Sequence, residues 1–80
     1  MRKLHYHDKF IEDLRTLDKS EQERVIHSLE KIRLNPELGK PLRPPLAGFF
    51  SERVGRLRII YEYDSENIHL RRCRERKKAY

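Results

Sequence analysis

With 80 residues, 40% of them charged, and no apolar run near the roughly 20 residues of a membrane span, the chain suits one small domain over residues 1–80 and not a membrane protein. Its whole formal charge of +6 comes from residues 40–80, with eleven Lys/Arg against five Asp/Glu, which indicates a cationic surface for nucleic acid, with a solvated basic tail as the alternative. Cys73 is the single cysteine and cannot form an internal disulfide, so we expect an inert thiol and a cytoplasmic protein.

The first residues alternate between apolar and polar side chains. Leu4 and Tyr6 alternate with His5 and His7, which predicts an opening strand. The two histidines share a face of that strand, but without a carboxylate partner they are a weak metal signal, and we expect an ordinary surface strand.

Two helices are predicted next. Asp8 is the expected cap of the first, whose apolar stripe is Phe10, Ile11, Leu14 and Leu17. Ser20 and Glu23 have the spacing of a capping box for the second, whose apolar face is Val25, Ile26, Leu29 and Ile32. The second helix should stop by Asn35, because Pro36 disfavours a helical conformation in the residue before it. The short connection predicts an antiparallel helical hairpin.

Residues 36–48 carry all four prolines and two of the three glycines, which predicts a long irregular connection. Lys40 and Arg43 make this connection basic, and long loops of this kind often carry function.

Two strands joined by a turn at residues 64–67 are predicted after it, over residues 57–63 and 68–74. The alternation places Leu57, Ile59 and Tyr61 toward the core and Arg58 on the opposite face. We therefore predict an α+β fold: an N-terminal strand, a helical hairpin, then a three-stranded antiparallel meander, with the helices packed on one face of the sheet. Arg53, Arg58 and Arg74 would then converge on the open, cationic face.

Several motifs of residues 46–80 resemble the signature of the RelE/ParE toxin superfamily. They are Leu46-Ala47-Gly48, the aromatic pair Phe49-Phe50, the basic Arg53, the strand Arg58-Ile59-Ile60-Tyr61 and a basic C-terminal strand that ends in Tyr80. The resemblance implies a RelE-like fold and the toxin of a type II toxin–antitoxin system, held inactive in a hetero-oligomer with a RelB-like antitoxin.

The same resemblance implies cleavage of mRNA, usually on the ribosome, by attack of the ribose 2′-hydroxyl, without metal or cofactor. By position, Arg74, Arg58, Arg53 and Tyr80 match the residues of the cleavage site. Arginine suits this task because its planar fork contacts phosphate oxygens in pairs and stays charged. We expect the surrounding cations to bind substrate, namely Lys40, Arg43, Arg56, Lys77 and Lys78.

The resemblance does not identify a general base in this sequence. Ser51 stands where RelE proteins have a lysine proposed for that role. The central segment looks more like the Yoe branch, whose catalytic carboxylate would align with Lys40. Lys40, Lys77 and Lys78 are the candidate proton carriers, because neighbouring cations lower the pKa of a lysine. The alternatives are a ParE-like inhibitor of DNA gyrase and a basic RNA binder without activity.

Overall fold

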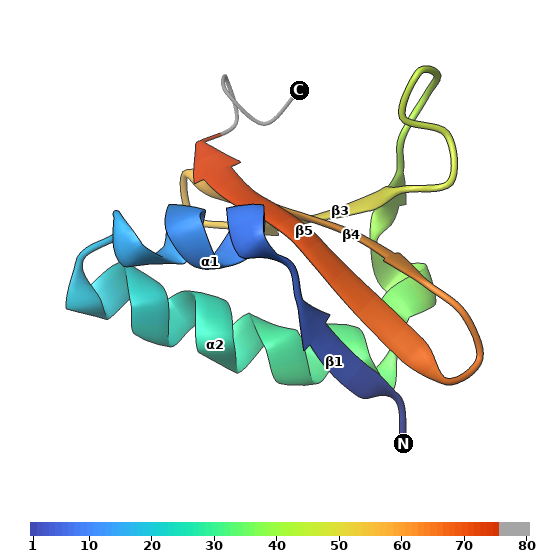
Figure 1. Cartoon of the computed structure of the whole chain (residues 1–80), viewed down its shortest axis with the longest axis horizontal. Helices are drawn as coiled ribbons and strands as arrows, with labels where there is room; N and C mark the ends of the chain where they lie inside the picture. The colour runs from blue at the N-terminus through green and yellow to red at the C-terminus, as the bar shows by residue number, and fades with distance from the viewer. Residues whose placement is uncertain (76–80) are drawn as a thin grey trace.

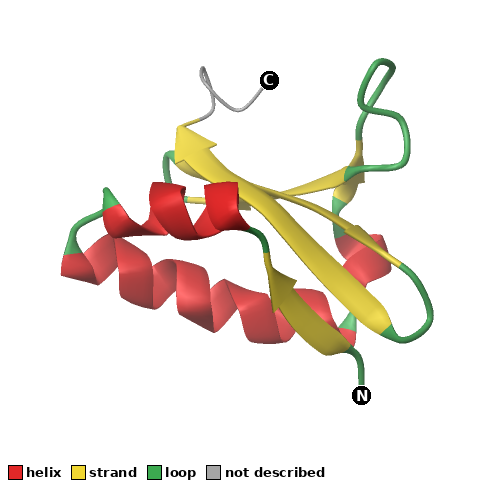
Figure 2. Ribbon diagram, viewed as in Figure 1, coloured by secondary structure: helices red, strands yellow, loops and turns green. Residues whose placement is uncertain are grey.

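The computed structural model describes residues 1–75, which form an α+β domain with one five-stranded sheet (Figure 1, Figure 2). Two helices, α1 (Asp8–Arg15) and α2 (Lys19–Leu34), precede the short 3-10 helix η1 (Pro36–Leu38). The strands are β1 (Lys3–Tyr6), β2 (Lys40–Pro41), β3 (Phe50–Val54), β4 (Leu57–Tyr63) and β5 (Asn67–Glu75). The order in the sheet is β1-β5-β4-β3-β2, with β1 parallel to β5 and every other pair antiparallel. The predicted fold class, helical hairpin and meander are confirmed.

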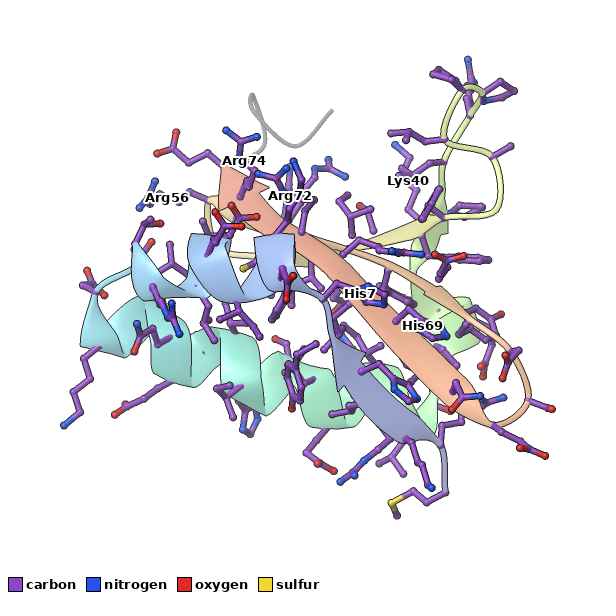
Figure 3. The ribbon with its side chains drawn as sticks, in the orientation of Figure 1. His7, Lys40, Arg56, His69, Arg72 and Arg74 are labelled. Atoms are coloured by element: carbon purple, nitrogen blue, oxygen red, sulfur yellow. The ribbon has the colours of Figure 1, made fainter. Side chains whose placement is uncertain are left out.

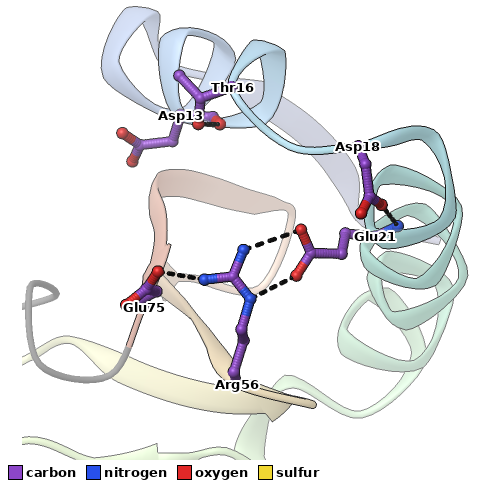
Figure 4. Close-up of polar contacts among 6 residues, drawn as sticks. All are labelled: Asp13, Thr16, Asp18, Glu21, Arg56 and Glu75. Carbon is purple, nitrogen blue, oxygen red and sulfur yellow. Dashed lines mark hydrogen bonds and ion pairs between the residues drawn. The ribbon is translucent and has the colours of Figure 1, made fainter.

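The starts of both helices differ from the prediction. His7 is the N-cap residue of α1 and Asp8 is its first helical residue, where its charge complements the helix dipole without capping it. Asp18 caps α2 through a 2.8 Å bond from the Glu21 backbone N–H to its carboxylate (Figure 4). The predicted capping box of Ser20 and Glu23 is therefore wrong, because α2 begins earlier and both residues lie inside it.

The apolar face of α2 is narrower than predicted. Val25, Leu29 and Ile32 are buried against the sheet, whereas Ile26 is 49% exposed. The helix ends at Leu34, one residue before the expected limit. Spacing explains the difference, because positions 25, 29 and 32 follow one helical stripe and position 26 lies beside it.

Residues 36–48 are more ordered than the proline content predicts. Helix η1 is followed by β2, which pairs with β3 and adds a strand that the sequence did not reveal. The buried Tyr61 hydroxyl donates a 2.6 Å hydrogen bond to the Pro36 carbonyl and so ties this segment to β4. Gly39 lies against the same ring, since a Cβ there would come within 2.1 Å of the hydroxyl oxygen.

One extra residue in β5 sets the register of the meander. Tyr61 pairs with Leu70 and Ile60 pairs with Arg72, which leaves Arg71 as a β-bulge. Ile68, Leu70 and Cys73 consequently all face the helices and are 0 to 1% exposed. A regular strand would break that face, because successive side chains alternate.

On the side of β1, the C-terminal half of β5 has no neighbouring strand within residues 1–75, and α1 covers this edge. The Asp13 carboxylate of α1 accepts the Cys73 backbone N–H at 3.0 Å and the Arg72 guanidinium at 2.9 and 3.1 Å. A free edge is a template for pairing with another chain, so this carboxylate protects β5 and anchors α1. Within residues 1–75 no helix is both long and apolar enough to cross a membrane.

Candidate nucleic-acid interface

Three arginines stand side by side on the three central strands of the sheet, near the turn between β3 and β4. Arg58 of β4 pairs with Arg53 of β3 on one side and with Arg74 of β5 on the other. Directly paired residues point to the same face with Cβ atoms about 4.5–5.5 Å apart. This arginine rung, Arg53, Arg58 and Arg74, faces away from the helices, because the flanking Leu57 and Ile59 are in the core.

Arg58 is the anchored member of the rung. It is only 8% exposed, and its Nη1 donates a 2.8 Å hydrogen bond to Oγ of Ser51, which is itself 3% exposed. The position where the resemblance places a lysine therefore holds a hydroxyl that orients Arg58. An arginine locked in this way loses little side-chain entropy when it binds an anion.

Among residues 1–75, the outer members of the rung have no carboxylate partner. Within residues 1–75 neither Arg53 nor Arg74 forms an ion pair, whereas Lys31, Arg33, Arg56, Arg71 and Arg72 each do. Like charges on one rung repel each other, and a bound polyanion relieves that repulsion. Arg53 and Arg74 are thus positive charges that the described part of the chain leaves for a ligand.

Lys40 lies on the same face of the sheet as the arginine rung, on β2, which is two strands from β4. It pairs with Ser51, and Ser51 in turn contacts Arg58, so the Lys40 side chain borders the rung. Figure 3 shows Lys40 at the base of the loop that projects from the sheet between β2 and β3. Arg43 belongs to that loop and is exposed. Of the predicted substrate-binding residues, these two stand on or beside the open face.

Arg56 is not brought to the rung. Its guanidinium donates to both oxygens of Glu21 at 2.8 and 3.0 Å and also pairs with Glu75, so it joins the turn after β3 to α2 (Figure 4). These carboxylates raise the pKa of Arg56 and offset its charge. Substrate binding by Arg56 stays a prediction that its contacts do not support. Lys77, Lys78 and Tyr80 lie outside the described residues.

The structure also gathers three histidines that the sequence analysis did not connect. His5 and His7 come from β1 and its end, and His69 comes from β5, which β1 joins in parallel with His5 opposite His69. The His5 and His69 rings stack with centroids 4.8 Å apart, and the His7 and His69 centroids are 5.3 Å apart. The only sequence signal was the shared face of His5 and His7, because no local pattern reveals a parallel partner.

Arg71, the bulge residue, joins this histidine cluster of His5, His7 and His69. Its Nη1 donates to His7 Nδ1 at 3.1 Å, and its other nitrogens pair with Glu62 at 2.6 and 2.7 Å. Burial, and then the Arg71 charge, lower the pKa of His7, with further lowering by His69 and His5 and opposition from Glu62. His7 is therefore neutral near pH 7. Among residues 1–75 no three His, Cys, Asp or Glu side chains are placed to hold a metal ion.

Cys73 takes no part in this surface. It is 1% exposed on the helix side of the sheet, and burial raises the pKa of its thiol to about 12, with Asp13 and Glu21 adding to the shift. The thiolate is the reactive form of cysteine, so the expected inert thiol agrees with this position.

Comparisons with known proteins agree with the fold described above. The chain is similar over 94% of its length to 98% of a chain in the toxin–antitoxin complex RelBE2 from Mycobacterium tuberculosis, with 28% identity and a TM-score of 0.85. A YoeB dimer from Staphylococcus aureus (23% identity, 91% and 94% of the two chains, TM-score 0.78) and the DinJ–YafQ complex from E. coli (17%, 100% and 99%, TM-score 0.76) share the fold.

A search of curated proteins finds none that matches this sequence. The profile of the ParE toxin of type II toxin–antitoxin systems, parDE, matches residues 4–80, nearly the whole chain. The chain therefore belongs to the ParE toxin family of type II toxin–antitoxin systems, within the RelE/ParE superfamily.

Proposed function

We propose that this toxin is an endoribonuclease that cleaves mRNA on the ribosome without a metal ion, and that the arginine rung holds the scissile phosphate. The observation that carries the proposal is the alignment of Arg53, Arg58 and Arg74 on one face, with the outer two free of carboxylates within residues 1–75. Three guanidinium groups at strand spacing offer paired N–H donors to the oxygens of one phosphate. A structural role alone would not place three like charges next to each other.

The reaction asks for charge stabilisation and two proton transfers. The ribose 2′-oxygen forms a bond to phosphorus as its proton passes to a base, and the bond from phosphorus to the 5′-oxygen breaks as that oxygen gains a proton. The products are a 2′,3′-cyclic phosphate and a 5′-hydroxyl. Arg74 and Arg58 stabilise the negative charge that builds up on the phosphate oxygens, and removal of one such donor costs on the order of 10²–10³ in rate.

The proton carriers are the least defined part of the proposal. Lys40 is the candidate within the described residues, because it borders the rung next to Ser51. Lys77 and Lys78 stay candidate proton carriers from the sequence. For Tyr80, which matches a residue of the cleavage site, we propose that it orients the substrate or stacks on a base. Arg53 contacts phosphate or lowers the pKa of a neighbouring lysine by its charge.

The partner in our proposal is a cognate antitoxin. The RelBE2 structure is a toxin–antitoxin complex, and this chain shares the fold of one of its chains. A toxin with a formal charge of +6 favours an acidic contact, and a disordered segment that folds on binding could neutralise the rung or cover it. The verified complex should then not cleave RNA.

A ribosome assay tests the nuclease. Translating ribosomes are incubated with wild type, Arg74→Ala or Arg15→Ala, and RNA ends are mapped. Arg15 is a matched control, because it is an exposed arginine of α1 away from the open face. We expect 2′,3′-cyclic phosphate ends with wild type and Arg15→Ala, and a rate about 10²–10³ lower with Arg74→Ala. Equal cleavage by both variants would contradict the proposal.

The second candidate function is the one that the resemblance to ParE-like proteins implies, namely inhibition of DNA gyrase by protein contacts. The rung argues against it, because an inhibitor of this kind needs no aligned phosphate donors. Intact RNA together with trapped gyrase in the same preparations would favour the inhibitor, and intact RNA with working gyrase would leave a basic binder without activity.

A further inference from the structure

We propose that the histidine cluster of His5, His7 and His69 is a second RNA subsite, which stacks an unpaired base of the strand whose phosphate lies on the arginine rung. This inference rests on the proposed function for the identity of the strand. Nothing in the comparisons assigns these residues a role.

The cluster has the shape of a stacking site. The His5 and His69 rings are nearly parallel, with an interplanar angle of 19°, and the His7 ring stands at 58° to that of His69. All three side chains are half-buried, so packing holds the rings while part of each faces solvent. Held aromatic rings suit an unpaired base, because stacking requires a flat face that is already oriented.

Hydrogen bonds set the protonation of the rings. A guanidinium can only donate, so Arg71 forces His7 Nδ1 to accept and His7 to carry its proton on Nε2. That Nε2–H donates to His69 Nδ1 at 3.1 Å, so His69 carries its proton on its own Nε2. These hydrogen bonds therefore run in one direction, from Arg71 to His7 and from His7 to His69. This arrangement requires that the His7 ring is neutral and that Nδ1 of His69 accepts a hydrogen bond. The cluster binds by stacking, while the rung binds by charge.

The cluster and the rung belong to one surface. His69 pairs with Glu62, and Glu62 lies on the same face of β4 as Ile60 and Arg58, because strand side chains alternate. Figure 3 shows His7 and His69 farther from the C-terminal end of β5 than Arg74. His69 and Arg74 pair with Glu62 and Arg58, which are four positions apart on β4, or about 13 Å of strand. An extended single strand with its phosphate on the rung can reach the histidines within a few nucleotides.

Single-stranded RNA fits this arrangement better than a duplex. In a duplex the bases are stacked on each other and their faces are hidden, whereas a loop or an unpaired message leaves them accessible. Glu62 is the acidic residue beside the cluster, and its ion pair with Arg71 lowers its repulsion of a phosphate chain. The site thus combines a neutral aromatic surface with a neighbouring cationic one, as expected for unpaired bases on a charged backbone.

The experiment uses a short single-stranded 2′-O-methyl oligoribonucleotide, which lacks the 2′-hydroxyl nucleophile and so measures binding without cleavage. Fluorescence anisotropy at about pH 7.5, above the usual histidine pKa, gives the affinity at several salt concentrations. The proteins are wild type, His69→Ala, His69→Phe, Arg74→Ala and the control His27→Ala. His27 is exposed on α2, on the helix side of the molecule. Thermal denaturation of each variant verifies folding.

We expect His69→Ala to bind about tenfold more weakly than wild type and His69→Phe to bind nearly as well, because a flat ring is what the site requires. The slope of log affinity against log salt should not change for His69→Ala but should become shallower by about 0.7 for Arg74→Ala, which removes a phosphate contact. In a series of oligomers that each carry one abasic nucleotide at a different position, the affinity of wild type should fall for one position only. The affinity of His69→Ala should not fall for that position.

Several results would overturn the subsite: equal affinities of His69→Ala and His27→Ala, a salt slope altered by His69→Ala, or no binding by wild type. The result is independent of the nuclease assay. Intact RNA on ribosomes together with His69-dependent binding would refute the proposed nuclease function but support the subsite. Arg74-dependent cleavage together with unaltered binding by His69→Ala would support the nuclease function but refute the subsite.

Discussion

Replacing Asp13 by alanine should destabilise the domain more than any other change to an exposed or partly exposed acidic residue of α1. Its carboxylate accepts three hydrogen bonds, one from the Cys73 backbone N–H and two from Arg72. The Cys73 residue is 1% exposed, so its N–H would lose its partner in a buried place, at a cost of about 1–3 kcal/mol. The ion pair adds about 1 kcal/mol, because the two side chains are 12% and 28% exposed and solvent screens part of the attraction.

Together these losses come to about 3 kcal/mol. For a domain of this size each kcal/mol lowers Tm by about 4–8 °C, so Asp13→Ala should melt roughly 12–24 °C below wild type. Asp13→Asn should lose less, since its amide oxygen still accepts the Cys73 N–H while the charge is gone.

Urea denaturation measures the effect, with Glu12→Ala as the matched control. Glu12 is exposed on the same helix and should change the free energy of unfolding by no more than about 0.5 kcal/mol. The midpoint should move without a change in the m-value. If Asp13→Ala unfolds within about 0.5 kcal/mol of Glu12→Ala, the carboxylate does not hold the edge of β5, and our account of that edge is wrong.

Three further predictions follow from buried or coupled groups. Tyr61→Phe should cost about 1–2 kcal/mol in urea denaturation, because it leaves the Pro36 carbonyl without the buried hydroxyl, and unchanged stability would show that water replaces it. Cys73 should resist thiol-labelling reagents at about pH 8 in the native protein and react only on unfolding, since burial raises its pKa to about 12; rapid native labelling would disprove this. Burial and the Arg71 charge lower the pKa of folded His7, so the unfolded chain binds the proton more readily and stability should fall as pH drops below about 6.5. His7→Gln should show a smaller fall in urea titrations at a series of pH values, and an equal fall would assign it to other groups.

Local periodicity predicted most of the elements and their buried faces, but it missed β2 and wrongly placed Ile26 on the buried face of α2. The stripe Val25, Leu29 and Ile32 and the alternation of Leu57, Ile59 and Tyr61 identify the buried side of α2 and β4, because burial follows the repeat of each secondary structure. The same alternation put Arg58 on the open face. Helix starts were less predictable, since Asp18 and Ser20 are both good caps and the choice between them depends on which turn packs on the sheet.

The local sequence pattern did not predict how strands distant in the sequence pair with each other. Without the bulge at Arg71, Cys73 would stand opposite Arg58, and Arg74 would face the helices opposite Leu57. One extra residue therefore brings the arginines together, and a one-residue change of register turns every later side chain to the other face. The parallel pairing of β1 with β5 likewise creates the histidine cluster.

Except for the short β2, the amino-acid sequence by itself determined the order of helices and strands, together with the excess of cations in the second half and the side of β4 that carries Arg58, because these depend on neighbours along the chain. The tertiary structure decided which cations meet. Arg56 is paired with carboxylates of α2 and β5, and Arg72 with one of α1, while Arg53 and Arg74 flank Arg58 without carboxylate partners among residues 1–75. The physical reason is that a charge is neutralised or left for a ligand by groups that only folding brings within a few ångströms of it.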